Sequence, residues 1–445
     1  MSIPSEHKGR HFYHFTHIDN IDSIVRNGLL ATNVKNQMEI RHHNVANMNI
    51  QHRRSEMEVP VGPGGFVHDY VPFYFASMNK MLLGLVNRKI VDQPYIVFMI
   101  VSIEKLLNAH VVFTDASANT DIPPNFFIDP DDLSKLNWRL IDSTKWKDDS
   151  DEALHKRMAE VLVYREVPID WIEGYIVFNS ISRNKIKEAY KKVGLNPPPI
   201  HPYWFNSRSF FFTKFFFPDR MNETLVTGPI QLYQIYSCVV NKIIEKRKNL
   251  VDTKKFIDIP DTIRKIDEDF CVIPELEGIY GLTTDNPMHL DTVSEHTQKV
   301  VGNLSSTQYY SSFNEHEKNI VKLSAYFHDI GKGPRSKWKD GVQKTYIDHP
   351  VDSLVMLERI FSEDILHVSK KEIQQVCLLV AYHDLLGDII GKGRSKSELI
   401  NLRLERAELL MLATLAEADI RALDGIWLLD IREQIEELVN EVMLY

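Results

Sequence analysis

The sequence contains few of the residues that would cross-link the chain or interrupt its folding. Only three cysteines occur among 445 residues, Cys238, Cys271 and Cys377, and no two of them have the spacing of a thiolate metal site. This excludes a disulfide framework and a thiolate zinc cage, and it fits a reducing compartment. Glycine and proline, with 19 and 20 residues, are not enriched, which excludes a large low-complexity or collagen-like segment.

Long apolar runs and an excess of positive charge are also missing. The most apolar strand-like run begins at Tyr95 and spans about nine residues, far fewer than the roughly 20 that cross a bilayer. The polar N-terminus lacks the apolar core of a signal peptide. We therefore expect a cytoplasmic protein that does not span a membrane. The balance of 52 Lys and Arg against 61 Asp and Glu, a formal charge of −9, argues against a basic coat for general nucleic-acid binding.

Residues 1–180 alternate strand-like runs with short helical stretches, which is typical of a mixed α/β domain. The first strand leads to Asp19, a candidate N-cap, and to a helix over 21–27 that Gly28 should end. Further along, Ser77 is positioned to cap the helix after the strand that ends near Tyr74.

The periodicity changes after about residue 228, where apolar residues recur every three or four positions up to the C-terminus. At roughly 150 residues per domain, the length predicts about three units. We predict an α+β domain over 1–208, a helical and aromatic connector over 209–270, and an all-α domain over 271–445.

Several polar side chains in the N-terminal part lie on or beside predicted strands. His14 and Thr16 belong to YHFTHIDN, Tyr74 to HDYVPFYFA, and Glu160 to RMAEVLVYREV. A single strand histidine is more often structural, a strand tyrosine is usually part of the core, and a glutamate that begins a strand is usually a solvated charge. In this order, however, the residues resemble the His-Tyr-Glu class of ADP-ribosyltransferases.

The sequence more closely resembles the DarT-type toxin family, whose members ADP-ribosylate single-stranded DNA. The motifs that carry the resemblance follow one another over roughly residues 10–180: YHFTHIDN, HRRSEMEVP, HDYVPFYFA, VFTD and RMAEVLVYREVP. The resemblance implies an α+β ADP-ribosyltransferase fold with an NAD cleft in a split β-sheet. It also implies that NAD is the substrate and that a macrodomain-type antitoxin is a partner.

The same resemblance implies roles for individual residues. Glu160 would be catalytic, because a carboxylate stabilises the positive charge that develops on the ribose when nicotinamide leaves. Arg54 would be the second catalytic residue, with Arg53 as the neighbouring alternative. NAD would be held by the residues assigned to cofactor binding: His14, Thr16, Tyr74 and Asn20.

Two local features concern the acceptor. The stretch from Arg41 to Arg54 holds six basic or imidazole residues and no acid, and we interpret it as a phosphate-binding strip beside the cleft. Ala116 and Ser117 follow VFTD, where DarT relatives carry a basic or imidazole side chain, so the preferred acceptor sequence stays open.

A second group of motifs lies in the C-terminal half. His296 is in SEHTQKVV, the pair His328-Asp329 is in LSAYFHDIGKG, and Asp419 is in LAEADIRALD. Adjacent His and Asp side chains can direct two ligands at one metal, and this donor set suits Mn, Fe, Mg, Ni or Zn. The ordered set resembles HD phosphohydrolases, in particular the HD domains of CCA-adding and uridylyl-removing enzymes, over roughly residues 270–430.

The HD resemblance implies that His296, His328, Asp329 and Asp419 are the primary metal ligands. His349 and His383 resemble the additional histidines of two-metal members, and a capping or packing role is equally compatible with them. A metal in such a site activates water for attack on phosphorus.

Three functions follow as hypotheses. The leading one is an NAD-dependent ADP-ribosyltransferase that modifies a base in single-stranded DNA, thymine before guanine or an RNA base, and acts as a toxin or phage-defence effector with a fused HD phosphohydrolase. The alternatives are an HD phosphohydrolase of nucleotides or RNA ends with an N-terminal NAD- or nucleic-acid-binding module, and an inert sensor. The sequence does not indicate the oligomeric state or the HD substrate.

Overall fold

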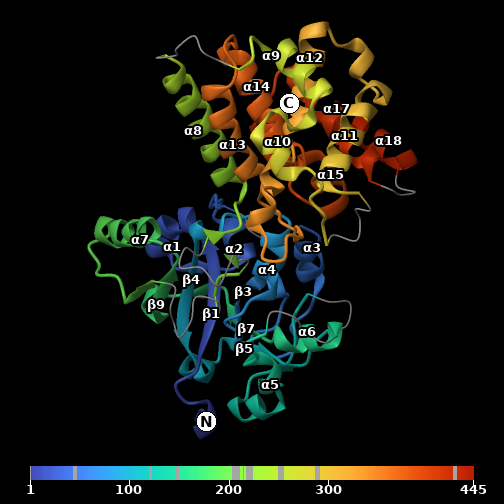
Figure 1. The fold of residues 1–445 in the computed structure, drawn as a ribbon. Coiled ribbons are helices and arrows are strands. Elements are labelled where there is room, and N and C mark those ends of the chain that lie inside the picture. The colour runs from blue at the N-terminus through green and yellow to red at the C-terminus, as the bar shows by residue number, and fades with distance from the viewer. Residues whose placement is uncertain are drawn as a thin grey trace. The chain divides into compact units, whose positions relative to one another are not determined.

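The computed structural model divides the chain into two compact units, residues 1–226 and 227–445 (Figure 1). The residues predicted to bind NAD lie in the first unit, and the HD motifs lie in the second. The structure describes residues 2–43, 48–119, 123–145, 150–202, 211–213, 215–216, 224–248, 255–285, 291–423 and 428–444. The predicted boundary at 208/209 lies outside the described residues. The predicted connector is divided between the two units, because Phe211 belongs to the first and the long helix α8 (Pro229–Arg247) to the second.

Unit 1 is built on a mixed sheet of eight strands in the order β10-β9-β4-β1-β3-β7-β5-β6. The strands share alternating or continuous apolar sequence, and their bounds are β1 (His11–His17), β3 (Tyr70–Tyr74), β4 (Ile96–Ser102), β5 (Val111–Thr114), β6 (Phe126–Phe127), β7 (Glu160–Tyr164), β9 (Ile172–Val177) and β10 (Ile200–Pro202). Two short strands, β2 (Leu29–Leu30) and β8 (Glu166–Val167), pair outside this sheet. The predicted α+β class is confirmed.

The sheet is split between β1 and β3. β1 pairs with β4 along all seven of its residues, from His11 to His17, whereas its pairing with β3 is limited to Tyr13 opposite Tyr74. Beyond this one pair, no further backbone pairing joins β1 to β3 among the described residues, and the strands are linked there by the His14 side chain, which bonds the Pro72 carbonyl. The split opens the sheet at the positions of the predicted NAD-binding residues.

Helices cover the sheet at its edges. Helix α1 (Ile21–Asn27) follows β1 and ends at Gly28, as predicted, with φ +77 at the glycine. It packs beside α7 (Ser180–Lys192), whose Ile186 and Ala189 enter the main core. The remaining helices of unit 1 are α2 (Thr32–Gln37), α3 (Met48–Glu56), α4 (Lys80–Asn87), α5 (Trp138–Ile141) and α6 (Asp151–Arg157).

Two capping predictions were wrong. Asp19 lies inside the 3-10 helix η2 (Ile18–Asn20), and the side chain that accepts from its first turn is that of His17. Helix α4 is capped by Asn79, whose Oδ1 accepts from two backbone N–H groups, and not by Ser77. In both places several polar residues compete within three positions, and the path of the preceding strand selects among them.

The aromatic part of the predicted connector, around 209–217, is expected to pack between the domains. Of the described part, Phe211 and Phe212 are fully buried and pack edge-on against Phe98 of β4 within unit 1. Their burial covers the face of the sheet opposite to α7. Phe210 and Phe217 lie outside the described residues.

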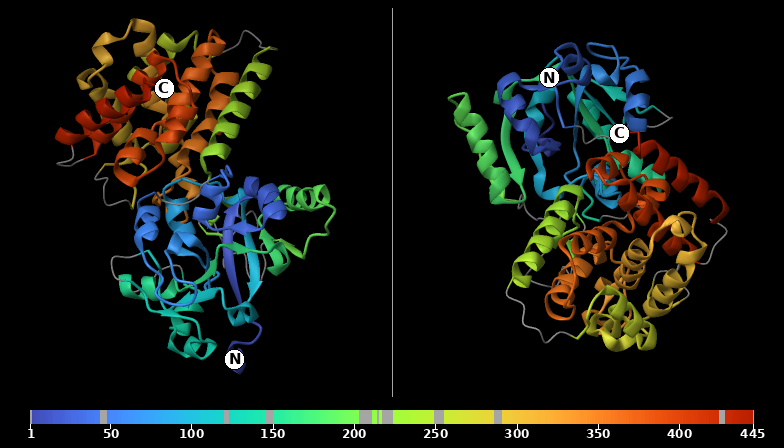
Figure 2. Two further views of the ribbon diagram at one scale, coloured as in Figure 1. Left: turned by 180° about the vertical axis from the view of Figure 1, so that it is seen from behind. Right: turned by 90° about the horizontal axis from the view of Figure 1, so that it is seen from above.

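Unit 2 is helical, as predicted (Figure 2). Its helices are α8, α9 (Ile259–Glu268), α10 (Pro274–Ile279), α11 (Val293–Asn303), α12 (Glu315–Phe327), α13 (His349–Glu363), α14 (Lys370–Tyr382), α15 (Leu385–Lys392), α16 (Lys396–Asn401), α17 (Arg406–Ala422) and α18 (Leu428–Val442). Helices α11, α12, α13, α14 and α17 contact one another around a common core.

Among the described residues, one helical stretch, 370–392, is long and apolar enough to cross a membrane. Within the unit 78% of its apolar window is buried, as in the core helix of a bundle, so its apolar side chains already have a protein environment.

Candidate active site and metal centre

A cleft of about 390 Å³ occupies the split in the sheet of unit 1. Its walls include all four residues predicted to hold NAD and the predicted catalytic arginine: His14, Thr16, Asn20, Tyr74 and Arg54. They come from β1, η2, β3 and α3, so segments up to 60 residues apart contribute to one cavity. The structure therefore brings these five predicted residues together.

His14 bridges the two strands that separate. Its Nδ1 donates to the Pro72 carbonyl of β3 at 2.7 Å, which leaves Nε2 as an acceptor. Burial lowers the pKa of His14 to about 4, although the hydrogen bond to Pro72 opposes the shift. A neutral imidazole with a fixed tautomer can accept a hydrogen bond from a ribose hydroxyl or an amide.

Tyr74 and Glu160 are direct cross-strand partners on β3 and β7. Burial and the nearby Glu160 carboxylate raise the pKa of Tyr74 well above its ordinary value, so the hydroxyl remains neutral. Glu160 itself is fully buried and is not among the residues that line the cleft. The structure places it one layer behind the wall.

Arg54 connects Glu160 to the cleft. Its guanidinium binds both carboxylate oxygens of Glu160, at 3.0 and 2.9 Å, in a bidentate pair that is only 5% exposed on the arginine side. The Ala118 N–H donates to the same carboxylate at 2.9 Å, and the Ala118 carbonyl accepts from Arg54. Arg53, the alternative, is exposed on α3. The geometry thus distinguishes the two arginines, which the sequence separated only weakly.

Further residues line the cleft that the sequence did not single out. Lys35, Gln51, His68 and Asn119 contribute side chains, and Gln51 and His68 are hydrogen-bonded to each other at 3.1 Å. Asn119 follows the Ala116-Ser117 step, whose side chains are buried, so Asn119 is the residue of this loop that reaches the cavity. No sequence signal separates these polar residues from other surface polar residues.

The predicted phosphate-binding strip is partly described. Arg41, His42 and His43 are exposed, and the two histidines line the cleft. Asn20 holds the backbone of His43 by two hydrogen bonds, accepting from its N–H at 2.7 Å and donating to its carbonyl at 2.9 Å. Residues 44–47 lie outside the described part of the chain.

In unit 2, the predicted metal ligands converge from different helices. The group consists of His296 on α11, His328 and Asp329 after α12, His349 on α13, His383 after α14 and Asp419 on α17, with Asp384 as an additional carboxylate. His296 Nε2 lies 2.8 Å from Asp419 Oδ1, and His328 Nε2 lies 3.3 Å from Asp329 Oδ2. Asp384 was not predicted, although its position in the second His-Asp dipeptide was a usable signal.

Three of the histidines have the same backbone partner geometry. The Nδ1 atoms of His328, His349 and His383 each bond a carbonyl three residues earlier, at 2.7–2.8 Å. This fixes Nδ1 as the donor and turns each Nε2 lone pair towards the centre, as metal-binding histidines require.

The donor set fits bound metal. His349 Nε2 and His383 Nε2 lie 3.1 Å apart, and with both Nδ1 atoms bonded to backbone carbonyls the two Nε2 atoms face each other. His328 Nε2 and Asp329 Oδ1 are buried and form no hydrogen bond. Although burial opposes it, the positive charge of Lys332 holds the pKa of Asp329 well below its usual range. A cation would coordinate the lone pairs of these atoms, which have no hydrogen-bond donor.

The overlap of three ligand triads indicates room for more than one ion. Asp329 belongs both to the triad with His296 and His328 and to the triad with His349 and His383, so its two oxygens face two adjacent positions. His349 and His383 therefore lie with the primary ligands, and not at a separate packing site.

A histidine, a tyrosine and a buried glutamate around a split sheet define the N-terminal unit as an ADP-ribosyltransferase, and the His-Asp centre defines the C-terminal unit as an HD domain. Residues 13–212 match the family described as ssDNA thymidine ADP-ribosyltransferase, DarT, and residues 289–423 match the HD domain. The DNA ADP-ribosyl transferase of Thermus sp. (strain 2.9) is 35% identical over 185 residues, which is 40% of this chain and 87% of that protein. The chain belongs to the DarT family, whose members are NAD-dependent DNA ADP-ribosyltransferases.

Two solved structures are also similar. Thermus sp. 2.9 DarT in complex with ADP-ribosylated ssDNA has 30% identity and a TM-score of 0.41, covering 45% of this chain and 96% of that one. Thermus sp. 2.9 DarT in complex with NAD+ has 28% identity and a TM-score of 0.39, covering 45% and 97%. The predicted combination of a DarT domain with a C-terminal HD domain is confirmed.

Proposed function

We propose that unit 1 transfers ADP-ribose from NAD to a base of single-stranded DNA, with thymine as the favoured acceptor. The observation that carries the proposal is the buried Arg54–Glu160 pair behind a cleft walled by His14 and Tyr74. Similarity to relatives that are DNA ADP-ribosyl transferases supports it.

In this proposal, the bond between nicotinamide and ribose breaks, and its electron pair leaves with nicotinamide. Glu160 stabilises the positive charge that develops on the ribose. His14 and Thr16 hold the dinucleotide, and Tyr74 packs on the nicotinamide ring. The ribose carbon then bonds to a base nitrogen, whose proton passes to solvent.

Arg54 has two roles in the proposed reaction. It holds both oxygens of Glu160 in a fixed orientation, which is the preorganisation that electrostatic catalysis needs. It also lines the cleft, where its positive charge can assist at the acceptor base or at a phosphate.

The test is incorporation of labelled NAD into oligonucleotides by the full chain. We expect label on single-stranded DNA that contains thymine, and a loss of at least about 100-fold in Glu160→Gln, as for removal of a group that stabilises transition-state charge. Glu166→Gln, on the exposed neighbouring strand β8, is the matched control and should keep full activity. Label on thymine-free DNA or on RNA would overturn the acceptor, and label that persists in Glu160→Gln would overturn the mechanism.

A second activity is supported by the seven-residue centre of unit 2, and we propose a metal-dependent phosphohydrolase there. Bound metal would supply an activated water for attack on phosphorus. His296, His328, Asp329 and Asp419 would hold one ion, and His349, His383 and Asp384 would help to hold a second. Its substrate would be a nucleotide, an RNA end or the ADP-ribosyl adduct itself.

Hydrolysis of each substrate, followed as release of phosphate or, for the ADP-ribosyl adduct, of AMP, should require Mn2+ or another divalent ion and disappear in His328→Ala. His367→Ala, an exposed histidine of the same unit, is the control. Release that survives in His328→Ala would rule out this centre. We further propose a toxin or phage-defence role in the cytoplasm, countered by a macrodomain-type antitoxin; growth arrest that depends on Glu160 would test it.

A further inference from the structure

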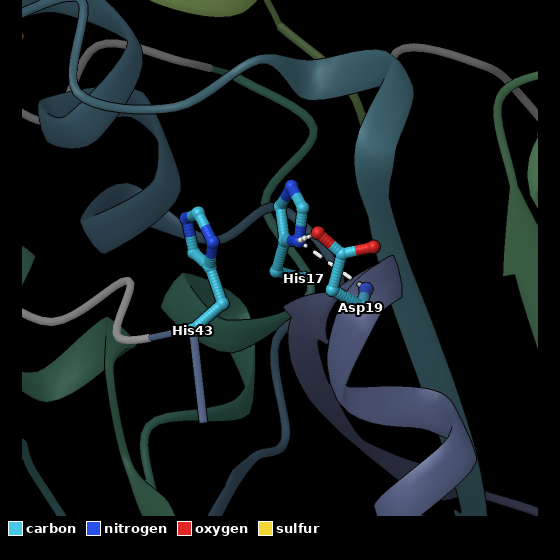
Figure 3. A group of neighbouring side chains, drawn as sticks. All are labelled: His17, Asp19 and His43. Carbon is cyan, nitrogen blue, oxygen red and sulfur yellow. Dashed lines mark hydrogen bonds and ion pairs between the residues drawn. The ribbon is translucent and has the colours of Figure 1, made fainter. Parts of the chain in front are cut away.

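A second group of metal-ligating side chains lies in unit 1, away from the HD centre. His17 is the last residue of β1, Asp19 lies in η2, and His43 lies in the exposed segment that lines the NAD cleft (Figure 3). Each offers one ligand atom, and these atoms all lie within 4.8 Å of one another. None of the three belongs to the proposed catalytic machinery.

His17 is the rigid member of the group. It is 3% exposed, and its Nδ1 accepts a long hydrogen bond of 3.2 Å from the Asp19 N–H. Because Nδ1 is the acceptor, Nε2 carries the proton, and that buried Nε2 has no hydrogen-bond partner. The ring therefore has the tautomer that can bind a metal through Nδ1, with the ion replacing the Asp19 N–H as the partner of that lone pair.

The carboxylate of Asp19 lies beside this nitrogen, with Oδ2 at 3.3 Å from His17 Nδ1 (Figure 3). Two ligands of a tetrahedral ion with bonds of about 2.0–2.1 Å are separated by about 3.3–3.4 Å, so the two atoms already have a suitable spacing. Lys185 of α7 is hydrogen-bonded to the other oxygen, Oδ1, which leaves Oδ2 available.

His43 supplies the adjustable third ligand. Its ring stacks on His17 with 3.9 Å between centroids and 15° between planes. Parallel rings do not direct their lone pairs at one point, so His43 must rotate to complete the site. It can do so because its side chain is exposed, while Asn20 keeps its backbone in place.

We propose that His17, Asp19 and His43 form a binding site for a divalent ion of the zinc type. Two imidazoles and one carboxylate are the donors of zinc sites that keep a fourth position open, and the same donors bind Co2+. A bound ion would fasten the His43 segment to the end of β1 and so restrict the movement of one wall of the NAD cleft.

Counting bound zinc in the full chain tests the proposal without relying on activity. Chelator-stripped wild type, His43→Ala and His42→Ala are dialysed against Zn2+, and metal per chain is measured. Ions at the HD centre are common to all three proteins, so differences report this site alone. We expect His43→Ala to lose about one ion, or to bind it at least about 100-fold more weakly, because even loss of an outer partner costs 10–100-fold.

His42→Ala, which changes the adjacent exposed histidine, should retain the ion. Lys185→Met should bind zinc more tightly than wild type, since it removes a positive charge next to Asp19. Equal zinc content in wild type and His43→Ala would overturn the proposal. Equal losses in both histidine variants would also overturn it, because they would place the ion on the loop alone.

Discussion

The buried pair between Arg54 and Glu160 should dominate the stability of unit 1 as well as its chemistry. Arg54 is 5% exposed and Glu160 is fully buried, and two charge-assisted bonds of 3.0 and 2.9 Å join them. Replacing one partner leaves the other charge buried without compensation, which costs about 3–5 kcal/mol. For a unit of this size that corresponds to a fall of about 6–20 °C in the unfolding midpoint.

A double-mutant cycle separates this cost from lost packing. We expect Arg54→Met and Glu160→Gln each to lower the free energy of unfolding strongly. The loss in the double variant should be smaller than the sum of the two single losses by at least about 2 kcal/mol. Arg53→Met, the exposed neighbour, should change stability by no more than about 0.5 kcal/mol.

The assay is calorimetric unfolding of the full chain, in which the wild-type transition that shifts with NAD identifies unit 1. The two units can unfold separately, so each transition is analysed on its own. A shift below about 2 °C in Arg54→Met, or fully additive losses in the double variant, would refute the reasoning.

Three further predictions concern single residues. The pKa of His14 is about 4 in the folded chain against an ordinary value of 6.5, so its neutral form contributes stability that is complete above pH 6.5 and is lost as the pH falls towards 4. In urea titrations, wild type should therefore lose about 1–3 kcal/mol more of its free energy of unfolding than His14→Gln does between pH 7 and 4.5. Equal losses in the two proteins would contradict this prediction. Gly331→Ala should destabilise unit 2 by more than about 3 kcal/mol, because the added Cβ would lie 2.1 Å from the His349 carbonyl oxygen. The control Gly302→Ala, at an exposed position of α11, should stabilise the unit by about 0.5–1 kcal/mol. Similar unfolding temperatures for the two variants would contradict the packing argument. His383→Ala should lower the metal content of the HD centre while His296 and its partners keep one ion, and an unchanged count by elemental analysis would exclude His383 as a ligand.

Much of the chain's organisation could be read from local patterns. The strand at His14, the helix ended by Gly28 and the helical C-terminal half follow from period-two and period-3.6 apolar spacing, which depends only on near neighbours. The identities of Glu160 and the His-Asp pair were also accessible, because the motifs that contain them keep their order and flanking residues.

The helix-capping residues and the location of the aromatic segment could not be predicted from local patterns. Asn79 replaced Ser77 as a cap, and Phe211 joined the core of unit 1, because several local solutions have similar energies and long-range packing selects one. Helix α8 likewise packs on α13 and α14, a set of contacts that the local apolar spacing does not specify.

The sequence by itself identified the candidate residues for the chemistry: a histidine, a tyrosine, an arginine and a glutamate for one unit, and histidines and aspartates for the other. Only the tertiary structure decided how they act together. It placed Glu160 behind Arg54 rather than in the cleft wall, chose Arg54 over Arg53, and added Asp384 to the metal centre. The physical reason is that burial and pairing of charges depend on contacts between segments far apart in the sequence, and the energies of such contacts cannot be read from neighbours along the chain.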